Sequence, residues 1–413
     1  MSNFTCPFCW RESPVGDSHL VCINPTAAVG QAFACAGYLR RDQLDVAQYL
    51  SFYQTKFDVD LAPLLAPDGP WNSGLQLAAG TVRPVLFARS KVKPWYAFHK
   101  DVHCPICRAD AQALEAACPQ CLESFPQRVL KDPAAAASVA VIGLAGSGKT
   151  CWLASLIGQP VGGTTPVIGH PRFLSQAQVL AISGTLPYPR ALFERTPDLP
   201  HPCAVSVHER AARKGLALFR DVPGERIQDW VHAKQGGDTS KWTQVTHKVQ
   251  SLCHRARRMV VMLNASNLKT EIAQLTPLIE HLAAERHDNV VDRLAVCVSA
   301  LDALGMEATQ PVAEWHNKAN SLVRDSGLLN RAAALCGETS RVRVFGLSAL
   351  GRSPVDVKLG DVVHVDHPVK TQVAQGPMKA IDGPMSPFGV LDPLYWLVRA
   401  AGPADDPQLG VPI

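Results

Sequence analysis

The chain has 413 residues, of which 47% are hydrophobic and 18% are charged, enough apolar material for two or three domains with substantial cores. Its formal net charge of +4 is too small over this length to draw nucleic acid or an anionic membrane surface, so we expect neither partner. The first residues, MSNFTCPFCW, lack the basic and apolar regions of a secretory signal, and no apolar stretch reaches membrane-spanning length. We therefore expect a cytoplasmic protein.

The amino-terminal third carries most of the cysteines, eight of the thirteen lying before residue 122. Paired Cys-Pro-x-Cys spacings favour metal thiolates in a reducing compartment over a disulfide framework. The doubled knuckles CPIC and CPQC predict one structural Zn²⁺ site with the ligands Cys104, Cys107, Cys118 and Cys121. A second Zn²⁺ site is predicted at Cys6, Cys9, Cys22 and Cys35, where His19 is an alternative ligand; Cys6 and Cys9 can also pair with one of the later knuckles.

The composition changes near FPQRVLKDPAAAAS, where prolines punctuate the chain before the first strand pattern. We predict a cysteine-rich zinc-binding module over 1–125, with a small subdomain inserted at 36–103. Aromatic residues interleaved with Arg and Lys in that insertion are interpreted as its small core and solvated rim. A second domain is expected over 134–402, and a flexible tail over 403–413.

Apolar runs of strand length then alternate with helical patterns, which indicates an α/β fold with a doubly wound, mostly parallel sheet. The predicted strands are 138–144, 203–209, 215–221, 259–265, 294–300 and 341–348. The predicted helices are 149–158, 275–287, 312–327 and 393–402.

The first strand of this series runs into a glycine-rich loop and then a helix, VAVIGLAGSGKTCWLASLI. Gly143, Gly148, Lys149 and Thr150 match G-x-x-x-x-G-K-[ST] in that context, which predicts a P-loop for a nucleoside triphosphate. We expect the nucleotide to contact the loop and the first residues of the helix that follows it. These residues are Gly143, Gly146, Ser147, Gly148, Lys149, Thr150 and Cys151. Lys149 would contact the β- and γ-phosphates, and Thr150 would bind Mg²⁺.

A second phosphate-sensing motif, DVPGE, ends the predicted strand 215–221. Asp221 is expected to hold Mg²⁺ through water, and Gly224 to offer its N–H to the γ-phosphate. Glu225 stands where several families orient the attacking water, and a carboxylate there predicts slow intrinsic turnover. Arg226 is an alternative source of positive charge, although we expect it to be solvated.

In the order of these motifs the chain resembles the TRAFAC class of P-loop GTPases. That resemblance places Asp302, in VSALD, where the class reads guanine, and Ser348 and Ala349 where it contacts the base from the backbone. Ser299 and Ala300 depart from the N/T-K-x-D pattern of the class, which weakens the expected preference for guanine, so we expect GTP as the nucleotide, with ATP as the alternative. The resemblance also requires a threonine on Mg²⁺, for which Thr196 is chosen over Thr164 and Thr165.

Zinc knuckles followed by GLAGSGKT and DVPGE look like the bacterial double-GTPase families, which implies a GTPase switch acting on partner proteins in a conflict or defence system. Two other interpretations remain open. In the first, the chain is a nucleotide-binding scaffold without useful turnover. In the second, it is an ATP-driven machine that works on nucleic acid.

Overall fold

The computed structural model of the protein divides the chain into two compact units, Met1–Ala134 and Ala135–Ile413, which we call the amino-terminal and carboxy-terminal units. The structure describes residues 3–22, 39–40, 82–83, 86–88, 114–120, 124–130, 136–158, 164–168, 190–191, 202–209, 212–236, 244–286, 291–307, 309–350, 355–357, 378–381, 387–398 and 410–413. The predicted limits of the insertion at 36–103 fall outside these residues and stay a prediction.

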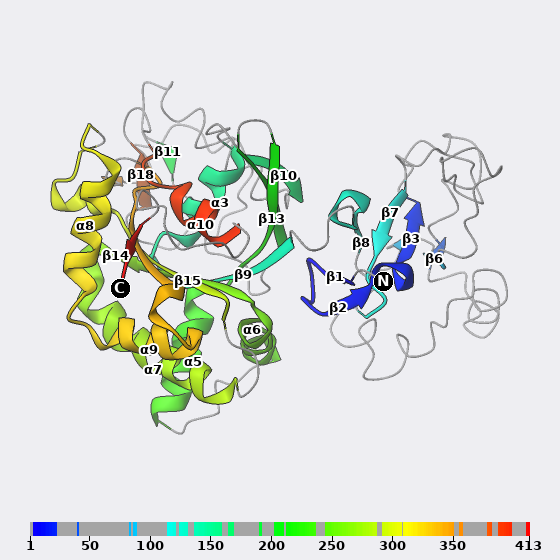
Figure 1. The fold of residues 1–413 in the computed structure, drawn as a ribbon, viewed down its shortest axis with the longest axis horizontal. Helices are drawn as coiled ribbons and strands as arrows, with labels where there is room; N and C mark the ends of the chain where they lie inside the picture. Colours follow the sequence, from blue (N-terminus) through cyan, green and yellow to red (C-terminus); the bar gives the residue numbers. More distant parts are fainter. Residues whose placement is uncertain are drawn as a thin grey trace. The chain divides into compact units, whose positions relative to one another are not determined.

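The amino-terminal unit is built from short antiparallel strands (Figure 1). β1 (Asn3–Thr5) and β2 (Glu12–Pro14) form a hairpin, and β4 (Leu39–Arg40) pairs with β5 (Val82–Arg83). A further sheet has the order β6 (Leu86–Ala88), β3 (His19–Cys22), β7 (Leu114–Ala117) and β8 (Ser124–Pro126). The 3-10 helices η1 (Val15–Asp17) and η5 (Gln127–Leu130) follow β2 and β8.

The carboxy-terminal unit contains an eight-stranded sheet, whose five middle strands are parallel. Its order is β10 (Thr164–Ile168), β12 (Pro202–Glu209), β13 (Ala212–Asp221), β9 (Ala136–Ile142), β14 (Arg258–Asn264), β15 (Arg293–Ser299), β16 (Val342–Gly346) and β19 (Val411–Pro412). β10, β12 and β19 run antiparallel to their neighbours. The unit therefore has the predicted α/β class with a mostly parallel sheet.

Helices cover both faces of this sheet, as its continuous apolar strands require. α3 (Lys149–Gly158) and α10 (Asp392–Val398) pack on one face, and α5 (Gly224–Gly236), α6 (Gln244–Arg255), α7 (Leu268–Glu285) and α9 (Gly327–Cys336) lie on the other (Figure 1). α8 (Val312–Val323) packs on β16. The 3-10 helices η7 (Ala265–Asn267), η8 (Leu301–Leu304) and η9 (Thr339–Arg341) complete the unit.

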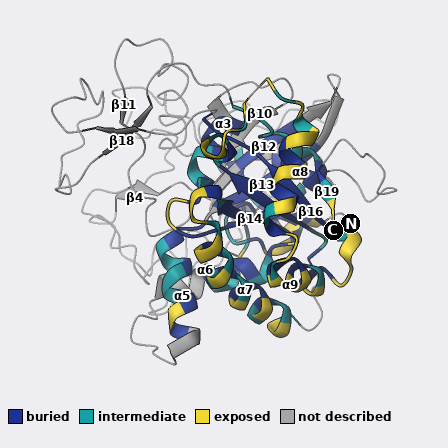
Figure 2. Ribbon diagram, turned by 90° about the vertical axis from the view of Figure 1, so that its left-hand side faces the viewer, coloured by how far each residue is buried: buried dark blue, intermediate teal, exposed yellow. Residues whose placement is uncertain are grey.

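Alternate side chains of the strands form the hydrophobic core on each face of the eight-stranded sheet. Val139 and Val141 face α3 and α10 together with Trp152 and Phe219, and all four side chains are fully buried. The strands are buried along their length, whereas the outer faces of the helices are exposed (Figure 2). A separate small sheet has the order β11 (Arg190–Ala191), β18 (Met378–Ile381) and β17 (Val355–Val357).

The last residues of the chain form an edge strand of the eight-stranded sheet. Residues 410–413, predicted as part of a flexible tail, include β19, which pairs antiparallel with β16 through Val411 opposite Val344. Gly410 has a φ of 72° and lies against the ring of Phe345, where an added Cβ would meet Cε1 at 2.5 Å. A proline-rich sequence is tolerated here because β19 is an edge strand.

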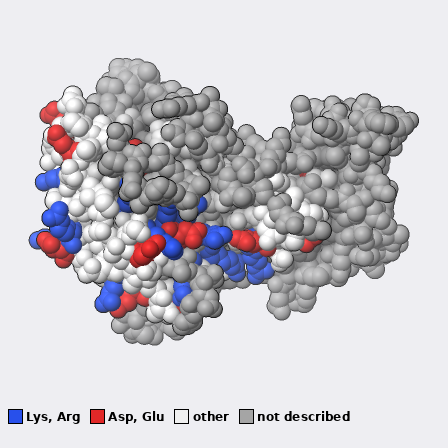
Figure 3. All heavy atoms as spheres, in the orientation of Figure 1, with Lys and Arg blue, Asp and Glu red and all other residues white. Residues whose placement is uncertain are grey.

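On the face shown in Figure 3, the described Lys and Arg side chains are interspersed with Asp and Glu. Within the described residues, no helix is both long and apolar enough to cross a membrane.

Candidate functional site

The predicted nucleotide residues gather at one edge of the eight-stranded sheet. β9 lies between β13 and β14, and the chain extends from β9 in both directions across the sheet. The carboxyl ends of the five parallel strands therefore meet at one edge, and strand order reverses beside β9. Ligands of open α/β sheets bind at such a point, which is where the P-loop begins.

The P-loop, residues 143–150, has a backbone that only glycine allows at three places. Gly146 and Gly148 have φ angles of 79° and 90°, in the left-handed region. At Gly143 an added Cβ would come within 2.5 Å of Ser147 Oγ and 2.6 Å of the Met262 carbonyl oxygen. The loop therefore turns tightly between β9 and the amino terminus of α3, an arrangement in which backbone N–H groups and the helix dipole attract an anion.

Lys149 lies folded along the inside of this loop, with only 5% of its surface exposed. Its Nζ donates to the Gly143 and Leu144 carbonyl oxygens at 2.9 and 2.8 Å, and approaches Ser147 Oγ at 3.2 Å. A buried ammonium needs such partners, because removal from water disfavours its charge. The loop thus holds a positive charge at the start of α3.

The DVPG motif lies directly against the P-loop. Asp221, the last residue of β13, is in register with Val141 of β9, so it leaves the sheet one strand away from the loop. Gly224 begins α5, and an added Cβ there would lie 2.3 Å from the Ala145 N atom. The structure therefore brings together the two motifs that the sequence places more than seventy residues apart.

Two polar residues that the sequence analysis did not assign to the site support the P-loop from neighbouring strands. Asn264, at the end of β14, donates from Nδ2 to the Gly146 carbonyl oxygen at 3.0 Å. Ser299, at the end of β15, donates from Oγ to the Ser147 carbonyl oxygen at 2.8 Å. A polar residue directly after a buried strand was the available signal. Ser299 departs from the GTPase pattern, yet its hydroxyl joins the SALD segment to the P-loop.

The predicted base-reading residues follow β15 and β16. Asp302 lies in η8, which is preceded by Ala300 in a left-handed conformation with a φ of 56°. A non-glycine residue pays a steric cost for that backbone, and such strain persists where the surrounding structure imposes it. Ser348 and Ala349 are buried after β16, and Ser348 exchanges two backbone hydrogen bonds with Phe388 at 2.9 and 2.8 Å.

The other predicted site residues lie in the first turns of α3 and α5. Thr150 and Cys151 are the second and third residues of α3, where Cys151 packs against the core. Glu225 is half-buried in the first turn of α5, and Arg226 pairs with Asp229 in the same helix at 3.0 Å.

The threonine that the GTPase class places on Mg²⁺ stays a prediction. Thr196 lies outside the described residues, while Thr164 and Thr165 are in β10, paired with Val207 and Ser206 of β12.

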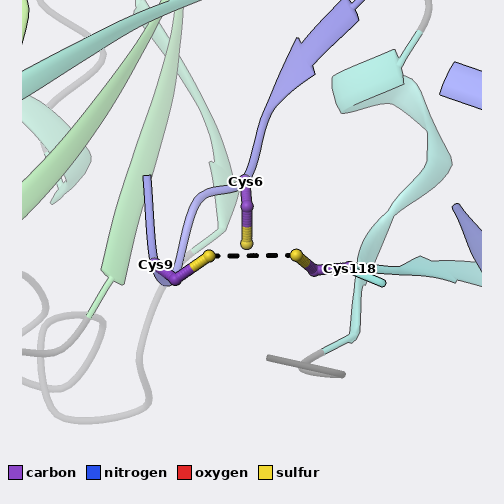
Figure 4. Close-up of side chains that lie close together, drawn as sticks. All are labelled: Cys6, Cys9 and Cys118. Carbon is purple, nitrogen blue, oxygen red and sulfur yellow. Dashed lines mark hydrogen bonds between the residues drawn. The ribbon is translucent and has the colours of Figure 1, made fainter. Parts of the chain in front are cut away.

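A separate candidate site in the amino-terminal unit consists of Cys6, Cys9 and Cys118, whose Sγ atoms all lie within 4.8 Å of one another (Figure 4). The Cys9 and Cys118 sulfurs are 3.8 Å apart. Tetrahedral zinc binds thiolates at about 2.3 Å, which separates any two sulfurs by about 3.8 Å. The three thiols therefore match a thiolate zinc site.

The two knuckles have the same local structure. The Phe8 N–H donates to Cys6 Sγ at 3.3 Å, and the Gln120 N–H donates to Cys118 Sγ at 3.3 Å. Each knuckle joins an antiparallel pair, β1 with β2 and β7 with β8, and Phe4 packs on Phe125 between the pairs with ring centroids 5.6 Å apart. Backbone donors aimed at sulfur stabilise thiolate, as a metal site requires.

This arrangement changes the predicted grouping of the cysteines. It joins Cys6 and Cys9 to the later knuckle at Cys118, which was the alternative pairing. Cys22 is opposite Leu114 in the β3–β7 register, four residues before Cys118, which is about 13 Å along a strand. The predicted role of Cys22 as a metal ligand stays a prediction.

The other predicted ligands are not joined to this cluster. His19, in β3, is not part of it, and burial lowers the pKa of its imidazole, with Asp17 opposing that shift. Cys35, Cys104, Cys107 and Cys121 lie outside the described residues.

Comparison with known proteins adds little to these observations. No protein-family model matches the chain, and no curated protein matches it. Among the solved structures that match is Era from Aquifex aeolicus, a Tyr-to-Ala variant bound to GDP.AlF4−, with a TM-score of 0.28 and 14% sequence identity. The match covers 52% of this chain and 51% of the Era chain, about half of each. A TM-score this low transfers neither fold nor function, so both rest on the residues of this chain.

Proposed function

We propose that the carboxy-terminal unit binds a nucleoside triphosphate with Mg²⁺ at the P-loop and hydrolyses it slowly, with guanine as the preferred base. The observation that carries the proposal is the P-loop itself: a left-handed glycine backbone at the start of α3, a buried Lys149, and Gly224 packed against the loop. The loop amides, the amino terminus of α3 and the Lys149 ammonium together supply the positive charge that attracts a polyanion.

Each residue of the site has a separate role in nucleotide binding and hydrolysis. The loop amides and Lys149 neutralise the β- and γ-phosphates, and the Gly224 N–H contacts the γ-phosphate. Bound Mg²⁺, held by Thr150 and Asp221, supplies charge neutralisation at the phosphate oxygens. Water adds to the γ-phosphorus, the bond to the β,γ-bridging oxygen breaks, and the products are nucleoside diphosphate and inorganic phosphate. Glu225 beside these oxygens keeps this step slow, because its charge repels them.

Base recognition is assigned to Asp302, whose carboxylate accepts the two N–H groups of guanine, and to the Ser348–Ala349 backbone. Ser299 links this region to the P-loop. Loss of the γ-phosphate releases Gly224 and with it α5, which makes the chain a switch for partner proteins. A role in bacterial conflict or defence is supported by motif order alone.

Nucleotide titration tests the proposal. Purified full-length protein should bind fluorescent GTP with Mg²⁺, and Lys149→Ala should weaken binding roughly 100-fold, or about 3 kcal/mol, because two charge-assisted contacts are lost. Lys269→Ala, which removes an exposed lysine from α7, is the matched control and should bind as the wild type does. Equal affinities for Lys149→Ala and Lys269→Ala would contradict the proposal.

The same titration separates the other interpretations. Binding without phosphate release above the Lys149→Ala background would leave the nucleotide-binding scaffold. A preference for ATP that Asp302→Ala does not change, with turnover stimulated by DNA or RNA, would favour the nucleic-acid machine.

For the amino-terminal unit we propose a structural Zn²⁺ site formed by Cys6, Cys9 and Cys118. The spacing of the later knuckle supplies Cys121 as the fourth thiolate. Four protein ligands leave no open position on zinc, so its role is to hold the two hairpins together.

A further inference from the structure

A buried acid in α7 is unused by the mechanism above. Glu271 is only 3% exposed and lies in the first turn of α7. Its Oε2 accepts the backbone N–H of Asn264 at 2.8 Å. A carboxylate is rarely buried without a cation in contact with it, because burial disfavours its charge by several kcal/mol.

Asn264 connects this acid to the P-loop. Its Nδ2 donates to the Gly146 carbonyl oxygen at 3.0 Å, and its Oδ1 accepts the Ser266 N–H at 2.9 Å. The side chain of Asn264 is therefore fixed at both ends, and its backbone is fixed by Glu271. Gly146 has the left-handed φ that shapes the loop, so the chain of bonds from Glu271 ends at a residue that sets the direction of the loop amides.

The charge of Glu271 is balanced between opposing effects. Burial raises the pKa of the carboxyl to about 7, while the Asn264 N–H and the Lys149 ammonium lower it. The other acidic residues of α7 pair elsewhere, Glu280 with Arg331 of α9 at 3.2 Å and Glu285 with His281 and with His254 of α6 at 2.8 Å, and Lys269 is exposed. Lys149 is thus the cation that acts on Glu271, and it is also the cation that the phosphates would use.

We propose that Glu271 and Asn264 form a proton-dependent support for the P-loop, through which nucleotide phosphates bind more tightly when the Glu271 carboxyl carries a proton. Both are positioning residues, since they act through Gly146 and Lys149. This inference rests on the proposed nucleotide function.

The charges around Lys149 determine the direction in which nucleotide affinity changes with pH. Phosphates bring negative charge next to Lys149, which disfavours the ionised form of Glu271, so nucleotide binding takes up a proton when the carboxyl is ionised beforehand. Below about pH 7 the carboxyl is already neutral and the uptake vanishes. Nucleotide affinity should therefore fall as the pH rises above 7, by at most about tenfold per pH unit.

The test is the pH dependence of nucleotide affinity in full-length protein, measured with fluorescent GDP and GTP from pH 6.5 to 8.5. Wild type should weaken more than Glu271→Gln, by up to roughly 20-fold over this range if the proton is fully taken up. The ionisation of the nucleotide is common to both proteins and cancels in their ratio. Glu280→Gln, on the same helix but half-exposed at its side chain, should follow the wild type.

Calorimetry in two buffers of different ionisation enthalpy supplies a second readout that a merely structural role would not move. At pH 8 wild type should take up more protons per nucleotide than Glu271→Gln. Asn264→Ala should bind nucleotide more weakly at every pH, because the bond from Nδ2 to the Gly146 carbonyl oxygen is lost, and should keep the pH dependence, because its backbone N–H still contacts Glu271. Thermal melting of each variant establishes that it is folded.

The outcomes separate the two proposals. Wild type that binds no nucleotide at any pH overturns the proposed function. Wild type that binds, with the same pH profile as Glu271→Gln, overturns the role of Glu271 and leaves the function standing. Asn264→Ala that binds nucleotide as tightly as the wild type overturns the connection through Gly146.

Discussion

At the scale of single residues, Gly224 shows how a close backbone approach creates the site. An added Cβ would lie 2.3 Å from the Ala145 N atom and 2.4 Å from the Leu144 carbonyl carbon, both backbone atoms that cannot rotate away. Gly224→Ala should therefore force α5 away from the P-loop. We expect a loss of about 1–3 kcal/mol in the free energy of unfolding, typical of overpacking, together with weaker GTP binding.

Gly327→Ala is a matched control for that change. Gly327 also begins a helix, α9, but an added Cβ would meet only Thr276 Cγ2, at 3.9 Å. Alanine there should stabilise slightly, by about 0.4–1 kcal/mol, because it restricts the unfolded chain. Denaturant titration of both variants measures the difference; equal effects would show that the contact of Gly224 with the P-loop is not tight.

At the scale of elements, the closing segment is attached to the sheet by specific bonds. The Trp152 Nε1–H of α3 donates to the Val390 carbonyl oxygen at 2.8 Å. His316 of α8 accepts the Gly346 N–H at Nδ1, 3.1 Å away, so its Nε2–H donates to Asp392, 3.2 Å away at the start of α10. One buried imidazole therefore joins α8, β16 and α10.

Replacing His316 by another aromatic residue removes its two hydrogen bonds, and so tests whether they hold α8, β16 and α10 together. His316→Phe keeps the edge-on contact with Phe345, whose centroid lies 5.5 Å away, but leaves the Gly346 N–H without its acceptor. We expect the free energy of unfolding to fall by about 1–3 kcal/mol, the cost of an unsatisfied buried donor. His232→Phe, at an exposed position of α5, should change it by less than about 0.5 kcal/mol in the same denaturant titration. A similar value for His316→Phe would show that the bonds contribute nothing.

The elements also show what local sequence determines. Apolar β-branched runs predicted β9, β14 and β15 to within two residues, because these strands are buried on both faces. The predicted helix 275–287 starts seven residues later than α7 does. The helix begins at Leu268 and contains Pro277.

The site was predictable only where one local motif defines it. The P-loop and DVPG are such motifs, since glycine backbone geometry is written in the sequence. Asn264, Glu271 and Ser299 were missed because their roles depend on which strand ends meet across the sheet. The pairing of Cys118 with Cys6 and Cys9 likewise depends on two hairpins more than a hundred residues apart, which spacing cannot specify.

At the scale of the whole molecule, the two units have cores of different kinds. The carboxy-terminal unit buries complete strands between two helical layers, whereas the described core of the amino-terminal unit consists of a few side chains around Phe4, Trp10, Leu20 and Phe125. Small cores of this kind usually need a metal or disulfides, and Cys6, Cys9 and Cys118 are not in disulfides. Zinc should therefore stabilise one unit and leave the other unaffected.

This difference predicts two independent responses in one protein. The purified chain should contain zinc, and Cys118→Ser should lose one equivalent by metal analysis, whereas Cys151→Ser, half-buried in α3, should retain it. A chelator should lower or abolish one thermal transition, because zinc binding free energy is folding free energy in such units. GTP with Mg²⁺ should raise the other transition only, since a ligand stabilises the unit that binds it. If the chelator shifts both transitions or neither, the zinc does not hold the amino-terminal unit alone.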